Sequence, residues 1–199
     1  MKVGFIVECG PAGAETKILP YLAQRLNPAI KPDVVPLESK AKLVSNCGTV
    51  AHKFLATGFA RVMIVWDLLP PWTDYEKRGC HHEDKAAIGK SLKAAGLKPG
   101  DTRIRLVCIE KMLEAWLIAD ERAIRAFLST PAHLAQVPRR KRPEEISDPK
   151  SALITLFRKS GSRINRYQDR THAIEIAKRM PDLTRLQKLA SFTYFESKL

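Results

Sequence analysis

Continuous apolar runs alternate with segments of helical spacing along the first 130 residues of the chain. Runs rich in β-branched and aromatic residues occur at Val3–Val7, Asp33–Leu37, Arg61–Trp66 and Arg103–Cys108. Such runs are typical of strands that are buried on both faces of a parallel sheet. The pattern therefore predicts four strands.

Between these runs the apolar residues recur every three or four positions, which is the spacing of helices. The predicted helices are Ala14–Leu26, Leu43–Gly58, Glu83–Ala95 and Lys111–Leu128. Strands and helices that alternate in this way indicate an α/β fold, with a mainly parallel sheet flanked by helices. The right-handed crossovers of such a fold bring the carboxyl ends of the strands to one edge, where ligands bind.

The pattern changes after about residue 130, where strand-like runs give way to polar and helical segments. The later features are a proline-bracketed basic segment and three helical patterns: Pro138–Pro143, Ser151–Lys159, Thr171–Met180 and Leu183–Leu199. We expect an α/β domain over residues 1–130 and a helical C-terminal extension over residues 131–199, packed on that domain.

The charge is unevenly distributed along the chain. Its 199 residues include 34 Lys and Arg against 21 Asp and Glu, a net charge of +13. Residues 131–199 hold 15 basic and 7 acidic residues, a net charge of +8, whereas residues 101–130 are neutral. This excess indicates a polyanionic partner, nucleic acid or an anionic membrane, although a solvated basic face without a partner fits the composition equally well.

Cysteine usage and hydropathy indicate a cytoplasmic protein. The four cysteines form no CxxC pair and no disulfide framework. The N-terminal apolar run is interrupted by Glu8 and is too short for a signal peptide, and no stretch is long enough to span a membrane. The metal-like cluster Cys80–Glu83 is more simply interpreted as a polar loop that leads into a helix.

Acidic residues follow three of the predicted strands. Glu8 and Asp67 come directly after their strands, and Glu110 lies two residues after the last one. Carboxylates that converge at one sheet edge require a compensating cation, for which Mg²⁺ or Mn²⁺ is the natural partner. Each acid taken alone has a simpler interpretation as a helix or turn cap.

Three segments give the chain a family resemblance: Val7–Leu22, Val62–Trp72 and Ile109–Asp120. They read VECGPAGAETKILPYL, VMIVWDLLPPW and IEKMLEAWLIAD. The chain resembles an uncharacterised family of small prokaryotic Toprim-like proteins (the domain of unknown function 4276 type), distantly related to the OLD-family nucleases. The resemblance implies a Toprim-like, Rossmann-like sheet with a divalent-metal site for phosphodiester chemistry.

The resemblance also implies roles for individual acids. Glu8 matches the family's general acid or base and possible metal ligand, and Asp67 matches a catalytic aspartate that binds Mg²⁺. Glu15 matches a second acid of the first segment, while Leu69 stands where the family has the second aspartate of its pair. Two further ligands and one additional acid are expected in the third segment: Glu110, Glu114 and Asp120.

These features predict a Mg²⁺- or Mn²⁺-dependent nuclease that acts on nucleic acid, preferentially DNA, in phage defence or DNA repair. Glu110 and Glu114, one helical turn apart, would supply oxygens in place of the missing aspartate. The basic residues Arg139, Arg140, Lys141 and Arg142 are expected to hold the phosphate backbone. Trp72 and Tyr75 could stack on an unpaired base, although packing over the site explains them equally well.

Two other functions remain open at this point. Leu69 favours a catalytically inactive Toprim-fold subunit that binds nucleic acid or an ABC- or SMC-like ATPase, a partner suggested by the resemblance. A phosphate-sensing α/β module is the third possibility. The sequence leaves the oligomeric state open.

Overall fold

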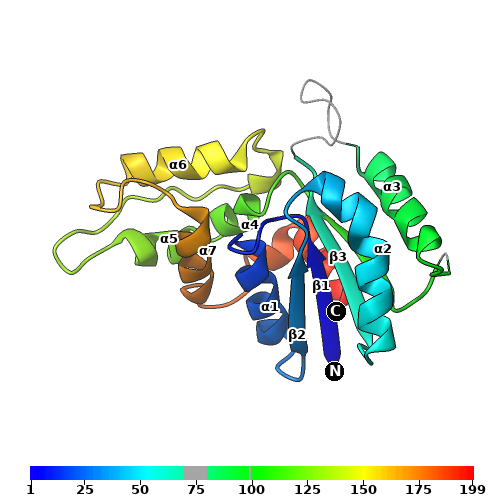
Figure 1. Cartoon of the computed structure of the whole chain (residues 1–199). Helices are drawn as coiled ribbons and strands as arrows, with labels where there is room; N and C mark the ends of the chain where they lie inside the picture. The colour runs from blue at the N-terminus through cyan, green and yellow to red at the C-terminus, as the bar shows by residue number, and fades with distance from the viewer. Residues whose placement is uncertain (70–79, 99) are drawn as a thin grey trace. The chain divides into compact units, whose positions relative to one another are not determined.

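The four apolar runs form four strands of one parallel sheet. The computed structural model describes residues 1–69, 80–98 and 100–199. Hydrogen bonds join the strands in the order β2-β1-β3-β4, and every neighbouring pair is parallel (Figure 1). The strands are β1 Lys2–Val7, β2 Lys31–Pro36, β3 Arg61–Asp67 and β4 Ile104–Ile109.

Helices follow each strand and make up most of the chain beyond β4. The α-helices of the described residues are α1 Glu15–Leu26, α2 Lys40–Ala56, α3 His81–Ala94, α4 Glu114–Ala119, α5 Glu121–Leu128, α6 Pro149–Lys159, α7 Asp169–Lys178 and α8 Ala190–Lys198. Short 3₁₀ turns lie at Pro143–Glu145 and Leu186–Lys188. The predicted α/β fold, with a parallel sheet and a helical C-terminal part, is confirmed.

The chain divides into two compact units. Unit 1 comprises Met1–Ile109 together with Tyr194–Leu199, and unit 2 comprises Glu110–Thr193. The sheet therefore belongs to unit 1, and the chain returns to this unit at its last residues. These bounds differ from the sequence-based division at residue 130, because α4 and α5 belong with the later helices.

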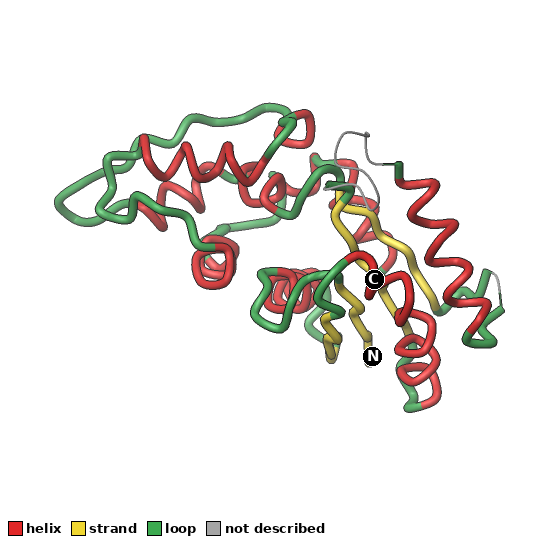
Figure 2. The backbone as a smooth tube through the Cα atoms, turned by 45° about the horizontal axis from the view of Figure 1, so that its top comes forward, coloured by secondary structure: helices red, strands yellow, loops and turns green. Residues whose placement is uncertain are grey.

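The core of unit 1 follows from the alternation of side chains along the strands. Ile64 and Trp66 of β3 point to one face of the sheet and pack with Cys47 of α2 and Ile88 of α3. Phe5 of β1 faces the other way, where its ring lies 6.3 Å from that of Phe195. Helices thus cover both faces of the sheet (Figure 2).

The core of unit 2 is built from helices and aromatic side chains. Trp116 of α4 is buried, meets the edge of the Phe192 ring at 5.0 Å, and donates its indole N–H to Ser191 Oγ at 2.8 Å. Phe157 of α6 packs edge-on against the Tyr167 ring at 5.4 Å. No helix among the described residues has the length and apolar character that crossing a membrane requires.

The prediction of one helix over Lys111–Leu128 is wrong, because the helical backbone is interrupted at Asp120. This residue has φ −111° and ψ 87°, outside the helical region, and its side chain accepts the backbone N–H of Arg122. Asp120 therefore caps the start of α5, and the apolar spacing continues across two separate helices.

The prediction of a single helix over Leu183–Leu199 is also wrong. Leu189 is extended, with ψ 131°, and separates the 3₁₀ turn from α8. The first backbone N–H groups of α8, those of Ala190 and Ser191, donate to the Glu144 carboxylate at 2.9 and 3.0 Å. A cap from 46 positions away thus fixes where this helix begins.

Candidate active site at the carboxyl edge of the sheet

Glu8 directly follows β1 and lies at the carboxyl edge of the sheet of unit 1. Its Oε1 accepts the backbone N–H of Asp67, the last residue of β3, at 3.2 Å. Its Oε2 is buried and has no hydrogen-bond partner among the described residues. A buried oxygen without a donor is costly in a native fold, so this carboxyl group calls for a proton or a cation.

The surroundings of Glu8 keep its carboxyl group protonated near neutral pH. Burial raises the pKa of Glu8 from its ordinary value of 4.5 to about 8. The charge of Lys40 and the hydrogen bond from Asp67 oppose this shift, whereas the charges of Glu15 and Asp84 add to it. Three helices of unit 1, α1, α2 and α3, thus contribute charged groups around Glu8.

Asp84 is a site residue that the sequence did not single out. It lies in the first turn of α3, is only 6% exposed, and accepts the indole N–H of Trp66 at 2.8 Å. Burial raises the pKa of Asp84, while Trp66 and Lys40 oppose the shift. The position of Asp84 at the start of a predicted helix was only a weak sign of a functional role, because an acid in the first turn usually just complements the helix dipole.

Lys40, the first residue of α2, is the basic group of this edge. Its Nζ donates to the backbone carbonyl of Leu68 at 3.0 Å, just beyond the end of β3. Its charge lowers the pKa values of both Glu8 and Asp84. One ammonium group therefore offsets part of the repulsion among the acids, and the edge carries both signs of charge.

Cys9 lies on the turn between β1 and α1, and Glu15 lies where this turn ends. Glu15 is the first residue of α1 and is half-buried. Burial and the charge of Glu15 raise the pKa of the Cys9 thiol, so this thiol stays protonated. Glu15 therefore belongs to the same charged edge as Glu8, whereas the Cys9 thiol is uncharged there.

The remaining predicted acids belong to unit 2. Glu110 follows β4 directly and is exposed. Glu114 is the first residue of α4 and is buried, with the Tyr167 hydroxyl 3.5 Å from its Oε1. Asp120 is fully buried and forms an ion pair with Arg122 at 2.9 Å. This environment gives Asp120 a structural role in capping α5 and orienting Arg122.

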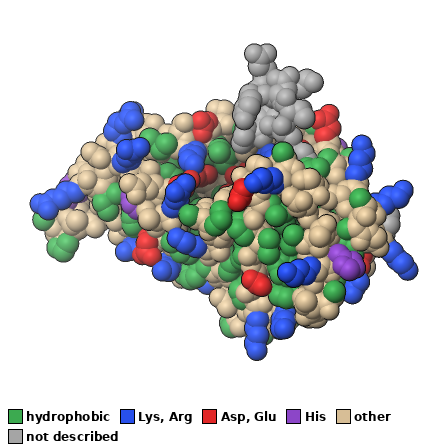
Figure 3. Space-filling view, in the orientation of Figure 1, with side chains coloured by type: hydrophobic (Ala, Val, Ile, Leu, Met, Phe, Trp, Pro, Cys, Tyr) green, Lys and Arg blue, Asp and Glu red, His purple; other side chains and the backbone are tan. Residues whose placement is uncertain are grey.

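The basic segment of unit 2 is exposed over its four cationic residues: Arg139, Arg140, Lys141 and Arg142. Arg142 forms an ion pair with Glu145 at 3.1 Å. Figure 3 shows that Lys and Arg side chains are spread over the face of the molecule it depicts. Trp72 and Tyr75, the two aromatic candidates for base stacking, lie outside the described residues.

The carboxylates of unit 1 fit a metal ion that takes only one or two ligands from the protein. Among residues 1–69, 80–98 and 100–199, no three His, Cys, Asp or Glu side chains are positioned to share one ion. Mg²⁺ commonly takes one or two carboxylates and completes its shell with water and substrate phosphate. The buried, unpartnered Oε2 of Glu8, beside Asp67, fits that sparse coordination.

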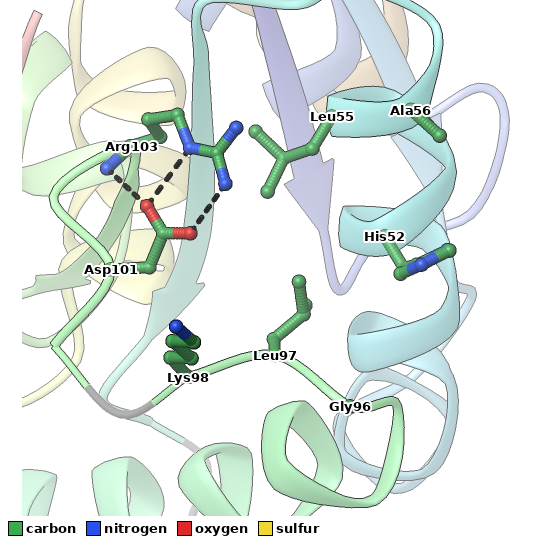
Figure 4. A pocket seen from close by; sticks show the side chains of 8 residues that line it. All are labelled: His52, Leu55, Ala56, Gly96, Leu97, Lys98, Asp101 and Arg103. Atoms are coloured by element: carbon green, nitrogen blue, oxygen red, sulfur yellow. Dashed lines mark hydrogen bonds and ion pairs between the residues drawn. The ribbon is translucent and has the colours of Figure 1, made fainter.

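A separate pocket of about 440 Å³ opens at the opposite edge of the sheet of unit 1. Figure 4 shows Arg103 and Asp101 joined by two hydrogen bonds between their side chains, at 3.1 and 2.7 Å. Because Arg103 is paired in this way, the pocket has less free charge than its lining suggests. The residues that line it are His52, Leu55, Ala56, Gly96, Leu97, Lys98, Asp101 and Arg103.

Comparison with known proteins identifies the family of this chain and no individual relative. Neither a curated protein nor a solved structure matches the chain. One family does match, over residues 16–199, which is most of the chain and includes Asp67, Asp84 and the basic segment. The chain therefore belongs to the family described as Domain of unknown function (DUF4276).

Proposed function

We propose that this protein is a Mg²⁺- or Mn²⁺-dependent phosphodiester hydrolase that acts on nucleic acid, as its Toprim-like motifs imply. The observation that carries the proposal is the Glu8 carboxyl group, with one oxygen fixed by the Asp67 backbone and the other buried without a donor among the described residues. Unpaired buried carboxyl groups cluster at functional sites, where a ligand completes them.

In this proposal Glu8 and Asp67 hold the ion, and the phosphate of the substrate completes its shell. When bound, the ion supplies the positive charge that draws a phosphate to this acidic edge and stabilises the leaving oxygen. Without the ion, a pKa of about 8 leaves the Glu8 carboxyl group protonated at neutral pH, and Glu8 would give up this proton when it binds the ion. Asp84 and Lys40 set the local charge that tunes Glu8.

The substrate class follows from the charge of unit 2. Four exposed cationic residues lie within the segment Pro138–Pro143. Contacts of this type bind phosphates with little regard to sequence and weaken steeply as salt is added. We therefore propose nucleic acid as the substrate, with DNA as the first choice, because the implied relatives act on DNA.

The test is cleavage of supercoiled plasmid, single-stranded circular DNA and RNA in Mg²⁺ or Mn²⁺. The wild-type protein should nick at least one of these substrates, and Glu8→Gln and Asp67→Asn should each lower the rate by 100-fold or more. Glu175→Gln is the matched control, because Glu175 is an acid on α7 that pairs with Lys178 and Arg179. This control should cleave at the wild-type rate.

Calorimetry with the metal alone provides a second readout that does not depend on activity. Because Glu8 is protonated at pH 7 without metal, Mn²⁺ binding should release a proton, and the heat should depend on the ionisation enthalpy of the buffer. Glu8→Gln should abolish that dependence. If the wild-type protein neither cleaved nucleic acid nor bound the metal, the proposal would be wrong.

A second candidate is a Toprim-fold subunit that binds nucleic acid without cleaving it. Leu69 favours this function, because the second aspartate of the implied pair is missing and Leu69 is partly buried. Salt-sensitive binding of DNA or RNA, with no cleavage and no metal heat, would select this candidate over the hydrolase.

A further inference from the structure

A pocket of about 120 Å³ lies within unit 2, and none of its lining residues is one that is proposed for catalysis. Its apolar walls include Ile118 of α4 and Ile146, which follows the 3₁₀ turn at Pro143–Glu145. The remaining lining comes from α6 and from the segment that contains Arg140. No acidic side chain lines this pocket among the described residues, so its electrostatic character is positive.

One stripe of α6 supplies a wall of this pocket. Ala152, Thr155, Leu156 and Lys159 all line it and stand at positions i, i+3, i+4 and i+7. The neighbouring stripe of the same helix, which contains Leu153 and Phe157, is buried in the core of unit 2. The helix therefore has a second face, on which Ala152 and Leu156 are half-buried and Thr155 and Lys159 are exposed, and this face looks into the pocket.

Two cations border the apolar walls. Arg140 and Lys159 both line the pocket and are both exposed, and neither takes part in an ion pair in the part of the chain that the structure describes. Arg140 also belongs to the basic segment, which can follow a phosphate backbone past the pocket. A ligand that combines a small apolar body with more than one negative charge fits this arrangement.

We propose that this pocket receives one unpaired nucleobase of a single-stranded nucleic acid, whose flanking phosphates are held by Arg140 and Lys159. An apolar cavity of about 150 Å³ encloses a whole benzene ring, so an open pocket of about 120 Å³ can take in part of one base while the rest of that base stays outside. Base burial of this kind favours single strands, whose bases are already unpaired. The inference rests on nucleic acid being the ligand, and it specifies single strands.

The test measures binding in EDTA, so that cleavage cannot interfere. A fluorescent 12-nucleotide single-stranded DNA is compared, by anisotropy, with the same strand carrying abasic sites, which keep the phosphates but lack the bases. The wild-type protein should bind the complete strand at least fivefold more tightly. Ala152→Phe, which fills the pocket, should remove that preference. Ile154→Phe on another face of α6 should keep it, since Ile154 does not line the pocket.

The cations are tested with matched pairs that change the charge equally. Arg140→Gln with Lys159→Gln should weaken binding about tenfold and remove most of the preference for the complete strand. The neighbouring pair, Arg139→Gln with Arg158→Gln, also removes two charges. Both double variants should therefore lower the salt dependence of binding to a similar extent, but this second one should keep the preference for the complete strand. Circular dichroism of each variant checks that the fold is intact.

Two results would overturn the inference. One is equal affinity of the wild-type protein for complete and abasic strands. The other is displacement of the strand by a peptide of alternating Leu and Glu at lower concentration than by unlabelled DNA, which would make the pocket a peptide site. Because these measurements need no metal, they are separate from the cleavage assay: a pocket that fails leaves Glu8-dependent cleavage untouched, and an inactive protein can still show the base preference.

Discussion

The backbone N–H of Asp67 donates to Oε1 of Glu8 at 3.2 Å, which joins the residue after β1 to the last residue of β3. Since the donor belongs to the backbone, a change of the Asp67 side chain leaves this bond in place. Asp67→Asn therefore removes a carboxylate charge while Glu8 keeps its position. A loss of activity in this variant can be assigned to the charge of Asp67 itself.

Glu8→Gln should stabilise the metal-free protein, and more strongly as the pH rises. The folded-state pKa of about 8 lies above the ordinary value of 4.5, so the folded protein holds a proton that the unfolded chain loses earlier. The stability this proton contributes is complete below about pH 4.5 and is lost as the pH rises through 8. Gln is neutral throughout, so its advantage should reach the order of 5 kcal/mol above pH 8.

Urea unfolding in EDTA at pH 5 and pH 8.5 measures this difference. Glu175→Gln serves as the control, because Lys178 and Arg179 lower the pKa of Glu175. Glu175→Gln removes a favourable charge, so it should not become stabilising as the pH rises. If Glu8→Gln were equally stabilising at both pH values, the protonated state assigned to Glu8 would be wrong.

Trp66→Phe should raise the pKa of Asp84 further. The Trp66 indole N–H is the hydrogen-bond donor that opposes the effect of burial on this carboxyl group. Removing it should also destabilise the fold by about 1–2 kcal/mol, since a buried acceptor loses its partner. NMR titration of the Asp84 carboxyl carbon gives the shift. Trp116→Phe, which loses an indole bond to Ser191 instead, should leave the Asp84 titration unchanged.

Gly48 and Gly89 should respond in opposite directions to alanine. A Cβ at Gly48 on α2 would come 2.2 Å from the Ser91 carbonyl oxygen of α3, so the two helices would have to separate. Gly48→Ala should cost at least about 2 kcal/mol. Gly89 on α3 has no atom within 4 Å of such a Cβ, and Gly89→Ala should stabilise by about 1 kcal/mol. Thermal unfolding of the two variants tests how closely α2 and α3 pack.

The strands could be predicted because their signal is local. β1 and β3 are continuous apolar runs, and buried parallel strands require such runs wherever they occur. The helix breaks at Asp120 and Leu189 were missed for the opposite reason. Apolar spacing continues through both breaks, and the α8 break depends on a cap from Glu144, distant in the sequence. No window along the chain contains that information.

The same distinction applies to the candidate site. Glu8 and Asp67 stand out because each follows a strand, and the sheet topology alone places strand ends together. Asp84 could not be singled out, since its importance comes from the Trp66 indole and from burial under the charged edge. Glu110 and Glu114 were expected to share a helix face because they are four residues apart, but α4 begins at Glu114 and leaves Glu110 outside the helix. Asp120, the additional acid of the third segment, bonds Arg122 within unit 2.

Arg122→Met should destabilise unit 2 by roughly 3 kcal/mol or more. Arg122 bonds Asp120, whose side chain is fully buried, and also Asp182, whose side chain is 43% exposed. Removing the guanidinium leaves the Asp120 charge buried without its cation, which is the costly way to break an ion pair. Asp182→Asn breaks the exposed half of the same network and should cost at most about 1 kcal/mol. The double variant Arg122→Met with Asp120→Asn should regain part of the lost stability, because the buried charge is then gone. Urea unfolding, followed by circular dichroism, compares the two single variants and the double variant. Equal costs for Arg122→Met and Asp182→Asn would show that burial of Asp120 is not what gives the pair its strength.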